Sequence, residues 1–251
     1  RSISTRCTRT TRRSSPFRPI RSRLFSHSAI YINTNKGIRE PKDLIGKRIG
    51  EFFLYGHDAG TWSKGILQDH YGVPIDSYSN YIGGVERPTP PLAWYKQKPP
   101  AHIKVQHIGT ETTLDKMLDD GEIDALFSAL VPPSMTRGSK NIRRLFPDFE
   151  KVERDYYKTT GIFPIQHVVA IRKDVYDANP WVATSLYKAF KESRDKAYEL
   201  YRHQAENMHR MFMVPWITQH FLGMQALLGD DWFPYGLKRN YKPLDTFLRY
   251  H

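Results

Sequence analysis

The stretch "SRLFSHS" carries three side chains whose types and spacing could do chemistry: Arg23, His27 and Ser28. A guanidinium suits the bidentate binding of a carboxylate, and an imidazole, with an ordinary pKa near ~6.5, suits proton exchange at neutral pH. We therefore predict that Arg23 and His27 act on an acidic ligand, with Ser28 beside them. In the alternative interpretation, Arg23 is one cation of a basic segment and His27 is an exposed residue at the end of a strand.

A second set of candidate side chains lies in "EFFLYGHDAGTW", between an expected strand and an expected helix. Tyr55, Gly56, His57 and Asp58 would lie at the N-terminus of that helix, where free backbone N–H groups favour an anion. We predict that these four residues bind the ligand. Asp58 could instead only cap the helix, which would leave His57 in solvent.

The third set lies in "TGIFPIQHVVAIRKD" and consists of Thr160, Phe163 and His167. A threonine hydroxyl can donate to a carboxylate, and a phenylalanine ring can lie against an aromatic ligand. His167 is a candidate proton donor, although an imidazole in an apolar run is equally a satisfied core residue. We expect the residues that follow it, Val168–Ile171, to enter the core.

Weaker candidates are found in three further segments. Gly83 and Gly84 would let a ligand approach the backbone closely, or they simply end a strand. Ser128 could reach the same site from the end of another strand. Tyr235 in "DDWFPYG" is a further candidate for ligand binding. In the alternative interpretation, Tyr235 and Trp232 pack their loop onto the core.

The elements that must position these residues alternate between strand and helix up to about residue 171, and are helical from there to the end. The expected strands cover 27–33, 47–53, 77–84, 103–108, a segment after Gly121, and 163–171. The expected helices cover 58–70, a segment before Gly121, and three segments that begin near Pro180, Pro215 and Pro243. This alternation indicates an α/β fold with a largely parallel sheet.

Two of the expected helices carry an apolar face at helical spacing. The face of the helix at 58–70 consists of Trp62, Ile66, Leu67 and Tyr71. The face of the helix that begins near Pro180 consists of Val182, Leu186, Ala189, Phe190, Ala197, Leu200 and Tyr201. Because such faces are typical of helices that pack on a core, we expect both to be buried.

Most of the positive charge lies in the first 26 residues. Of the formal net charge of +12, this basic head contributes +8 from eight arginines and no acid, and residues 27–251 contribute +4. Residues 27–251 contain no long stripe of lysine and arginine, so we expect no nucleic-acid partner. The Arg-, Ser- and Thr-rich head has the composition of a mitochondrial transit peptide, and a disordered basic tail is the alternative.

Hydropathy and cysteine usage bear on the compartment. No apolar run approaches the ~20 residues of a membrane span, so we expect no membrane partner. The one cysteine, Cys7, cannot form a disulfide within the chain, which fits a reducing compartment. We therefore expect a cytoplasmic protein, with a mitochondrial location as the alternative that the basic head suggests.

Several segments together resemble the 4,5-dihydroxyphthalate decarboxylase family. They are "SHSAIYINTNKGIREPKDLIGKRIGE", "LDDGEIDALFSA", "NIRRLFPDFEKVERDYYKTTGIFPIQHVVAIRKDVYDANPWVATSLYKAF" and "GDDWFPYGL", and the resemblance covers residues 14–251. The pieces "DL.GKR.G" and "GEIDAL" are shared with the wider superfamily of type II periplasmic substrate-binding proteins. The pieces "TGIFPI.H" and "DDW.PYG" are narrower and indicate the decarboxylase branch.

The resemblance implies a two-lobed, type II periplasmic-binding-protein-like α/β fold with a helical C-terminal segment. Residues 27–39 and 156–251 would form lobe one, residues 40–155 would form an inserted lobe two, and residues 1–26 would be a disordered head. Ligands of such folds bind in the cleft between the lobes. The family has a further segment ahead of the part that matches Ser15–Phe17, where this chain carries its basic head. We therefore expect an incomplete lobe one.

The resemblance also implies an enzyme, a carboxy-lyase that converts a 4,5-dihydroxyphthalate-like aromatic dicarboxylate to a dihydroxybenzoate. His27 or His167 would donate the proton, and Arg23 with the helix N-terminus near Asp58 would hold a carboxylate. A hydroxyl para to the leaving group can supply electron density, so we expect no cofactor. A metal site formed by His27, His57, His167 and Asp58 is disfavoured, because none of them has the short paired spacing of a zinc motif.

Two other functions stay open at this point. The chain could be a non-catalytic protein that binds a small aromatic carboxylate, or it could be an inactive, truncated relative of the decarboxylases. Whether the chain is an enzyme or a binding protein, the expected partner is a small-molecule aromatic carboxylate. A homo-oligomer is also open.

Overall fold

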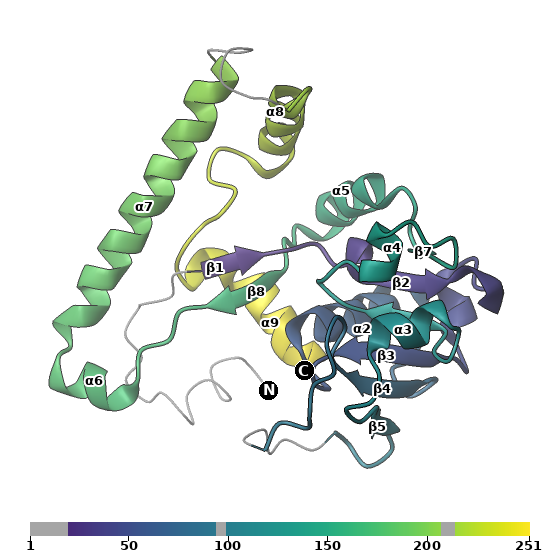
Figure 1. Ribbon diagram of the computed structural model, residues 1–251. Coiled ribbons are helices and arrows are strands. Elements are labelled where there is room, and N and C mark those ends of the chain that lie inside the picture. The colour runs from purple at the N-terminus through teal and green to yellow at the C-terminus, as the bar shows by residue number, and fades with distance from the viewer. Residues whose placement is uncertain (1–19, 94–98, 207–213) are drawn as a thin grey trace. The chain divides into compact units, whose positions relative to one another are not determined.

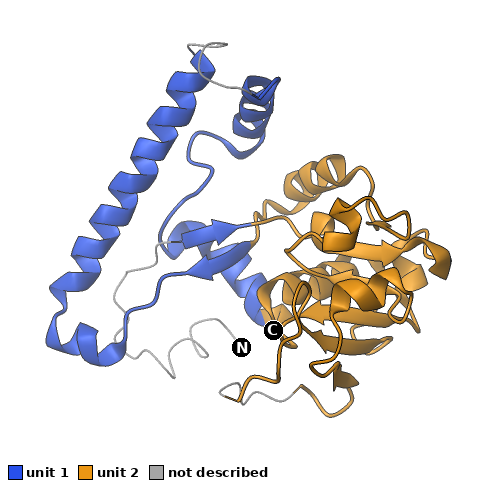
Figure 2. Cartoon of the chain, viewed as in Figure 1, with its two compact units in different colours: residues 1–23, 165–248 blue, residues 24–164, 249–251 orange. Residues whose placement is uncertain are grey.

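The computed structural model describes residues 20–93, 99–206 and 214–251 of the chain. It is a mixed α/β structure, which confirms the predicted α/β class. The chain divides into two compact units, which Figure 2 shows in different colours. Unit 1 comprises residues 1–23 and 165–248, and unit 2 comprises residues 24–164 and 249–251. The structure thus groups residues 27–39 with 40–155, whereas the sequence-based division placed them with 156–251.

Unit 2 is built on a six-stranded sheet with the strand order β5-β4-β3-β6-β2-β7 (Figure 1). The strands are β2 (Ile30–Asn33), β3 (Arg48–Phe52), β4 (Ser79–Gly83), β5 (Val105–His107), β6 (Ala125–Phe127) and β7 (Ile142–Arg144). Strands β3 to β6 run parallel to one another, but β2 is antiparallel to both β6 and β7. The predicted largely parallel sheet is therefore mixed, because β2 enters it from the opposite direction.

The helices of unit 2 connect these strands. They are α2 (Asp58–Tyr71), α3 (Leu114–Asp119), α4 (Pro133–Thr136), α5 (Phe149–Thr160) and three short 3-10 helices, η1 (His27–Ala29), η2 (Thr34–Lys36) and η3 (Pro41–Leu44). The predicted apolar face of α2 is confirmed for Trp62, Ile66 and Leu67, which are all buried. Helix α2 ends at Gly72, whose φ of +66° suits a residue without a side chain.

The core of unit 2 lies on both faces of its sheet. Successive residues of β2 divide between two clusters of buried side chains: Ile30 and Ile32 belong to one, and Tyr31 belongs to the other. Because successive side chains of a strand point to opposite faces, β2 is covered on both. This explains why the strand has an almost continuous apolar sequence.

Unit 1 consists of a two-stranded antiparallel sheet and a set of helices. Strand β1 (Ile20–Arg23) pairs with β8 (Ile165–Val168), and the helices are α6 (Lys173–Ala178), α7 (Trp181–Glu206), α8 (Ile217–Leu228), η4 (Lys238–Asn240) and α9 (Tyr241–Tyr250), whose last residues belong to unit 2. Residues 20–23 of the predicted disordered head thus form a strand. The rest of the predicted transit peptide or tail, residues 1–19, lies outside the described part of the chain.

Two burial predictions for unit 1 are wrong. Val168 is 47% exposed, and within the described residues its strand, β8, belongs to a sheet of two strands. The predicted apolar face of α7 is also not buried, since Leu200 and Tyr201 are about half exposed. Helix α7 instead packs through Tyr198, whose ring lies 4.1 Å from that of Trp232. Within the described residues, every helix falls short of the length or the hydropathy that a membrane span requires.

Candidate functional site

The parallel strands of unit 2 end at one edge of the sheet, and most of the residues of the second candidate set lie there. Phe52, the last residue of β3, lies opposite Gly83, the last residue of β4. The chain then turns from β3 into α2, and the N–H of Phe53 donates to the carbonyl of Gly83 at 2.7 Å. Because ligands of open α/β sheets bind outside the carboxyl ends of the strands, this edge is the candidate site of unit 2.

The turn between β3 and α2 (residues 53–57), called the β3–α2 turn below, is held by a buried carboxylate. Glu51, one residue before the end of β3, is fully buried. Its Oε1 accepts the N–H of Gly56 at 2.9 Å, and its Oε2 lies 2.7 Å from the ammonium of Lys64 on α2. The Lys64 side chain is only 5% exposed, so the ion pair is closed to solvent.

Burial shifts the pKa values of Lys64 and of its neighbour Tyr55. Burial lowers the pKa of Lys64, and the charge of Glu51 opposes that shift. Burial, with a smaller contribution from the Glu51 charge, raises the pKa of Tyr55 to about 12. Tyr55 is therefore a neutral phenol at physiological pH. The ammonium of Lys64 lies 3.5 Å from the centroid of the Tyr55 ring, a cation–π contact.

His57 and Asp58 form a second pair at the start of α2. The Nδ1 atom of His57 lies 2.6 Å from Oδ1 of Asp58, and both side chains are mostly buried. The same Oδ1 accepts the N–H of Ala59 at 2.8 Å. Asp58 thus satisfies a free N–H at the helix start. It is the first residue of the helix and not its N-cap residue, because His57 occupies the N-cap position. The contact between His57 and Asp58 is close but lacks hydrogen-bond geometry, because Nδ1 of His57 has no hydrogen-bond partner within the described residues.

Gly83 and Gly84 are required by the packing of the protein itself. A Cβ at Gly84 would lie 1.8 Å from the carbonyl oxygen of Arg87, and a Cβ at Gly83 would lie 2.5 Å from Ile108. Ligand contact at these glycines stays a prediction. Ser128, which follows β6 directly, is fully buried. Within the described residues, its hydroxyl donates to the carbonyl of Leu130 and accepts the N–H of the same residue.

The sequence was compared with protein-family models and with curated proteins. No family model matches it. The 4,5-dihydroxyphthalate decarboxylase of Comamonas testosteroni is 32% identical over 229 residues, which are 90% of this chain and 67% of that protein. The chain belongs to the 4,5-dihydroxyphthalate decarboxylase family. This confirms the predicted membership of a family of carboxy-lyases.

A second member of the decarboxylase family covers less of the chain. The 4,5-dihydroxyphthalate decarboxylase of Pseudomonas putida is 33% identical over 139 residues, which are 55% of this chain. The matched part is 52% of that protein. The chain therefore spans about two thirds of the length of the Comamonas testosteroni protein and about half of the length of the Pseudomonas putida protein.

In this member of the decarboxylase family, His27 is a core residue. It is 1% exposed, and the rings of Tyr71, Phe146 and Tyr156 surround it with centroids 5.2–5.9 Å away. Neither ring nitrogen has a hydrogen-bond partner within the part of the chain that the structure describes. Burial, with a smaller effect of His70, lowers the pKa of His27 to about 4. The interpretation of His27 as an exposed strand-end residue is therefore wrong, and its role as proton donor stays a prediction for a neutral imidazole.

Three further predicted residues of unit 2 make structural contacts. The N–H of Ser28 donates to Oε1 of Glu153 at 2.8 Å. The hydroxyl of Thr160 donates to the carbonyl of Tyr156 at 2.7 Å, at the end of α5. The ring of Phe163 stacks on that of Phe25 with centroids 4.6 Å apart. The partners in these three contacts all lie outside the β3–α2 turn.

The remaining predicted residues, Arg23, His167 and Tyr235, lie in unit 1. Arg23 donates to Oδ1 of Asn240 and to the carbonyl of Pro234, so it ties β1 to the C-terminal loop. His167 is exposed, and its Nδ1 lies 2.5 Å from the hydroxyl of Ser22 on β1. The Tyr235 ring lies under the guanidinium of Arg194 at 4.9 Å, as expected for the packing interpretation of its loop.

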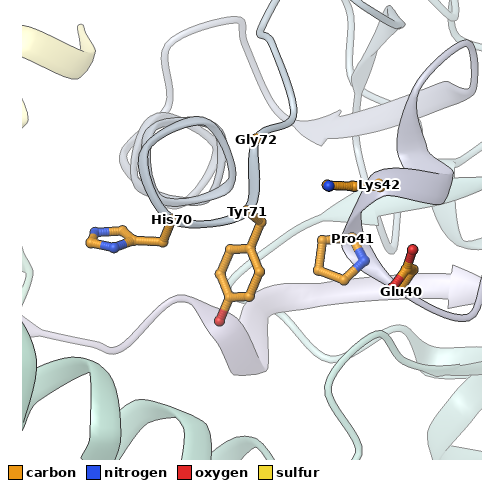
Figure 3. Close-up of a pocket in the computed structure, with 6 residues that line it drawn as sticks. All are labelled: Glu40, Pro41, Lys42, His70, Tyr71 and Gly72. Atoms are coloured by element: carbon orange, nitrogen blue, oxygen red, sulfur yellow. The ribbon is translucent and has the colours of Figure 1, made fainter.

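A surface pocket of about 400 Å³ lies elsewhere in unit 2, between η3 and the end of α2 (Figure 3). It is lined by Glu40, Pro41, Lys42, His70, Tyr71 and Gly72. None of the predicted site residues is among these six. The described residues also contain no group of three His, Cys, Asp or Glu side chains that could hold a metal ion.

Sequence reasoning missed Glu51 and Lys64, which organise the β3–α2 turn. A signal for each was present. Glu51 is a lone carboxylate in the strand sequence "RIGEF", and Lys64 interrupts the apolar run of α2 in "TWSKGIL". A charge at a position with buried neighbours requires a partner of opposite sign, and the partner here comes from the next element along the chain.

Proposed function

We propose that this chain catalyses the decarboxylation of a dihydroxylated aromatic dicarboxylate, such as 4,5-dihydroxyphthalate, to a dihydroxybenzoate. The match to the Comamonas testosteroni decarboxylase over 229 residues carries this proposal. In the reaction, the bond between the ring and one carboxylate breaks, carbon dioxide leaves, and the ring carbon keeps the electron pair and takes up a proton.

The β3–α2 turn supports three of the functions that this chemistry needs. The N-terminus of α2, with its free N–H groups, would hold the retained carboxylate. Tyr55, a neutral phenol, would donate a hydrogen bond to a ligand oxygen. His57, which lies beside Asp58, would deliver the proton to the ring carbon. His27, His167 and Arg23 remain the alternative candidates for acid and carboxylate binding.

We further propose the two-lobed, type II periplasmic-binding-protein-like fold for the chain. Three observations support it. The chain forms two compact units, it passes from one unit to the other at residues 23–24, 164–165 and, three residues before its end, 248–249, and unit 2 contains four consecutive parallel strands. In this fold the inserted lobe would correspond to unit 2 and most of the first predicted lobe to unit 1, except that its residues 27–39, 156–164 and 249–251 lie in unit 2.

The test is whether the purified chain turns over 4,5-dihydroxyphthalate. Turnover is measured as the loss of substrate and the release of carbon dioxide. Wild-type turnover supports the proposal. Saturable binding without turnover would indicate a non-catalytic binding protein instead, and the absence of both would refute the proposed function for this chain.

Single histidine variants then identify the acid. We expect His57→Ala to lower kcat about 10²-fold. The variants His27→Ala and His167→Ala test the other two candidates in the same assay. His102→Ala, at an exposed position of unit 2, is the matched control and should keep the wild-type kcat. A wild-type kcat in His57→Ala removes His57 from the mechanism.

A further inference from the structure

The Glu51–Lys64 ion pair is closed to solvent and lies directly against the β3–α2 turn. Both side chains are almost completely buried, and the two charges are 2.7 Å apart. A pair buried to this degree contributes little to stability, because the cost of removing two charges from water offsets their attraction. Its presence therefore points to a role other than stability.

Each partner of the pair contacts a residue of the turn. Glu51 accepts the N–H of Gly56, and Lys64 places its ammonium 3.5 Å from the ring centroid of Tyr55. The chain also leaves space for the carboxylate on α2, where Gly60 faces it. A Cβ at Gly60 would lie 2.1 Å from Oε1 of Glu51, so a side chain at this position would displace the carboxylate.

The backbone of the turn is in a conformation that needs support. Phe53 has a φ of +72°, in the left-handed region that bulky residues rarely adopt. Such a conformation persists only where the surrounding structure holds it, and it is found most often at functional sites. Here the N–H of Phe53 is held by Gly83 at one end of the turn, and the N–H of Gly56 is held by Glu51 at the other.

We propose that Glu51 and Lys64 are positioning residues of the substrate site, whose ion pair fixes the β3–α2 turn and holds the Tyr55 ring where its hydroxyl meets the ligand. This inference rests on the proposed function, because it assigns Tyr55 an aromatic carboxylate as ligand. Neither Glu51 nor Lys64 touches the ligand. Their effect on the reaction passes through Tyr55.

The experiment is a double-mutant cycle between the ion pair and the Tyr55 hydroxyl. Glu51→Gln/Lys64→Met removes both charges together, so that no unpaired charge stays buried. Tyr55→Phe removes the hydroxyl and keeps the ring. The matched control is Arg48→Met, which breaks the ion pair of Arg48 with Asp124 at the opposite end of the same strand. Circular dichroism checks that each variant is folded.

We expect the pair variant to lower kcat by about tenfold or more, because misplacement of a positioned group by about 1 Å has effects of this size. In the Tyr55→Phe background the same change should lower kcat less than about threefold, since two groups that act together are not additive. Arg48→Met should keep the wild-type kcat. Equal effects of the pair variant in both backgrounds would overturn the positioning role and leave the proposed function intact.

Failure of the proposed function gives a different result. If the wild-type chain binds 4,5-dihydroxyphthalate but does not turn it over, the decarboxylase is refuted, and the cycle is measured on Kd. Coupling between the pair and Tyr55 in Kd then supports the positioning role, and additivity overturns it. A folded wild-type chain that neither binds nor turns over this probe overturns both proposals.

Discussion

The burial of His27 leads to a quantitative prediction about acid stability. Its imidazole lies among three aromatic rings, has no hydrogen-bond partner in residues 20–93, 99–206 and 214–251, and has a pKa lowered to about 4. In the unfolded chain the pKa returns to the ordinary value of 6.5. Above pH 6.5 the side chain is neutral in both states, so it does not make stability depend on pH.

Below pH 6.5 the unfolded chain binds a proton that folded unit 2 excludes. The free energy of unfolding therefore decreases as the pH falls, by up to ~1.4 kcal/mol per pH unit. The decrease is complete once the pH is below about 4, because His27 is then protonated in both states. From the separation of the two pKa values, the total loss is about 3 kcal/mol.

Urea unfolding at a series of pH values between 7 and 3.5 measures this loss. We expect His27→Phe, which replaces the imidazole by a ring that cannot titrate, to lack it. His27→Met, with a side chain that adapts to irregular space, is the second variant if the phenyl ring does not fit. His102→Phe, at an exposed position, is the matched control and should keep the wild-type dependence on pH.

The difference between the wild-type and variant curves isolates His27. Burial raises the pKa of Glu153, so this carboxyl also makes stability depend on pH, but it does so in both proteins and cancels. If His27→Phe and wild type lose stability in parallel as the pH falls, the imidazole is not excluded from water in solution. That result would refute the burial argument and would restore His27 as an accessible proton donor.

Three further predictions concern two glycines that leave no space for an added Cβ and one tryptophan with a left-handed backbone conformation. Gly60→Ala should destabilise the chain by about 1–3 kcal/mol in urea unfolding, because its Cβ would lie 2.1 Å from the carboxylate of Glu51; an unchanged midpoint would contradict the packing. Gly65→Ala should expel the ring of Tyr250, which lies 2.1 Å from the new Cβ, and hydrogen exchange at the C-terminus should rise; unchanged protection there would count against this contact. Trp216→Asn should stabilise the chain by about 1 kcal/mol, because Trp216 has a φ of +61° and is 73% exposed, and asparagine tolerates that conformation; a lower melting temperature would disprove it.

Local signals predicted much of unit 2 correctly. Helix α2 was expected at 58–70 and lies at Asp58–Tyr71, because its apolar face and the glycine that ends it are both local features. The strands β3 and β4 were expected for similar reasons. Helix α5 (Phe149–Thr160) was not predicted, since half of its residues are charged and it fully buries Glu153 and Tyr156 alone.

The candidate site was predicted less well. The sequence placed Tyr55–Asp58 at the start of a helix, where the structure has them, because a strand followed by a helix start is visible locally. It also nominated His27, Ser28 and Thr160, whose contacts are internal to unit 2. Composition cannot distinguish a histidine that faces a ligand from one that faces three aromatic rings, because those rings come from residues far along the chain.

The sequence by itself determined the α/β class, the apolar face of α2, the turn that carries Tyr55 and His57, and the family to which the chain belongs. These depend on the spacing of residues within short segments or on the matched order of residues along the chain. Only the tertiary structure decided that β2 is antiparallel to its neighbours, that the predicted apolar face of α7 is not buried, and that Glu51 and Lys64 form an ion pair next to the β3–α2 turn. Each of these depends on which elements become neighbours, and burial and charge pairing are properties of neighbours in space.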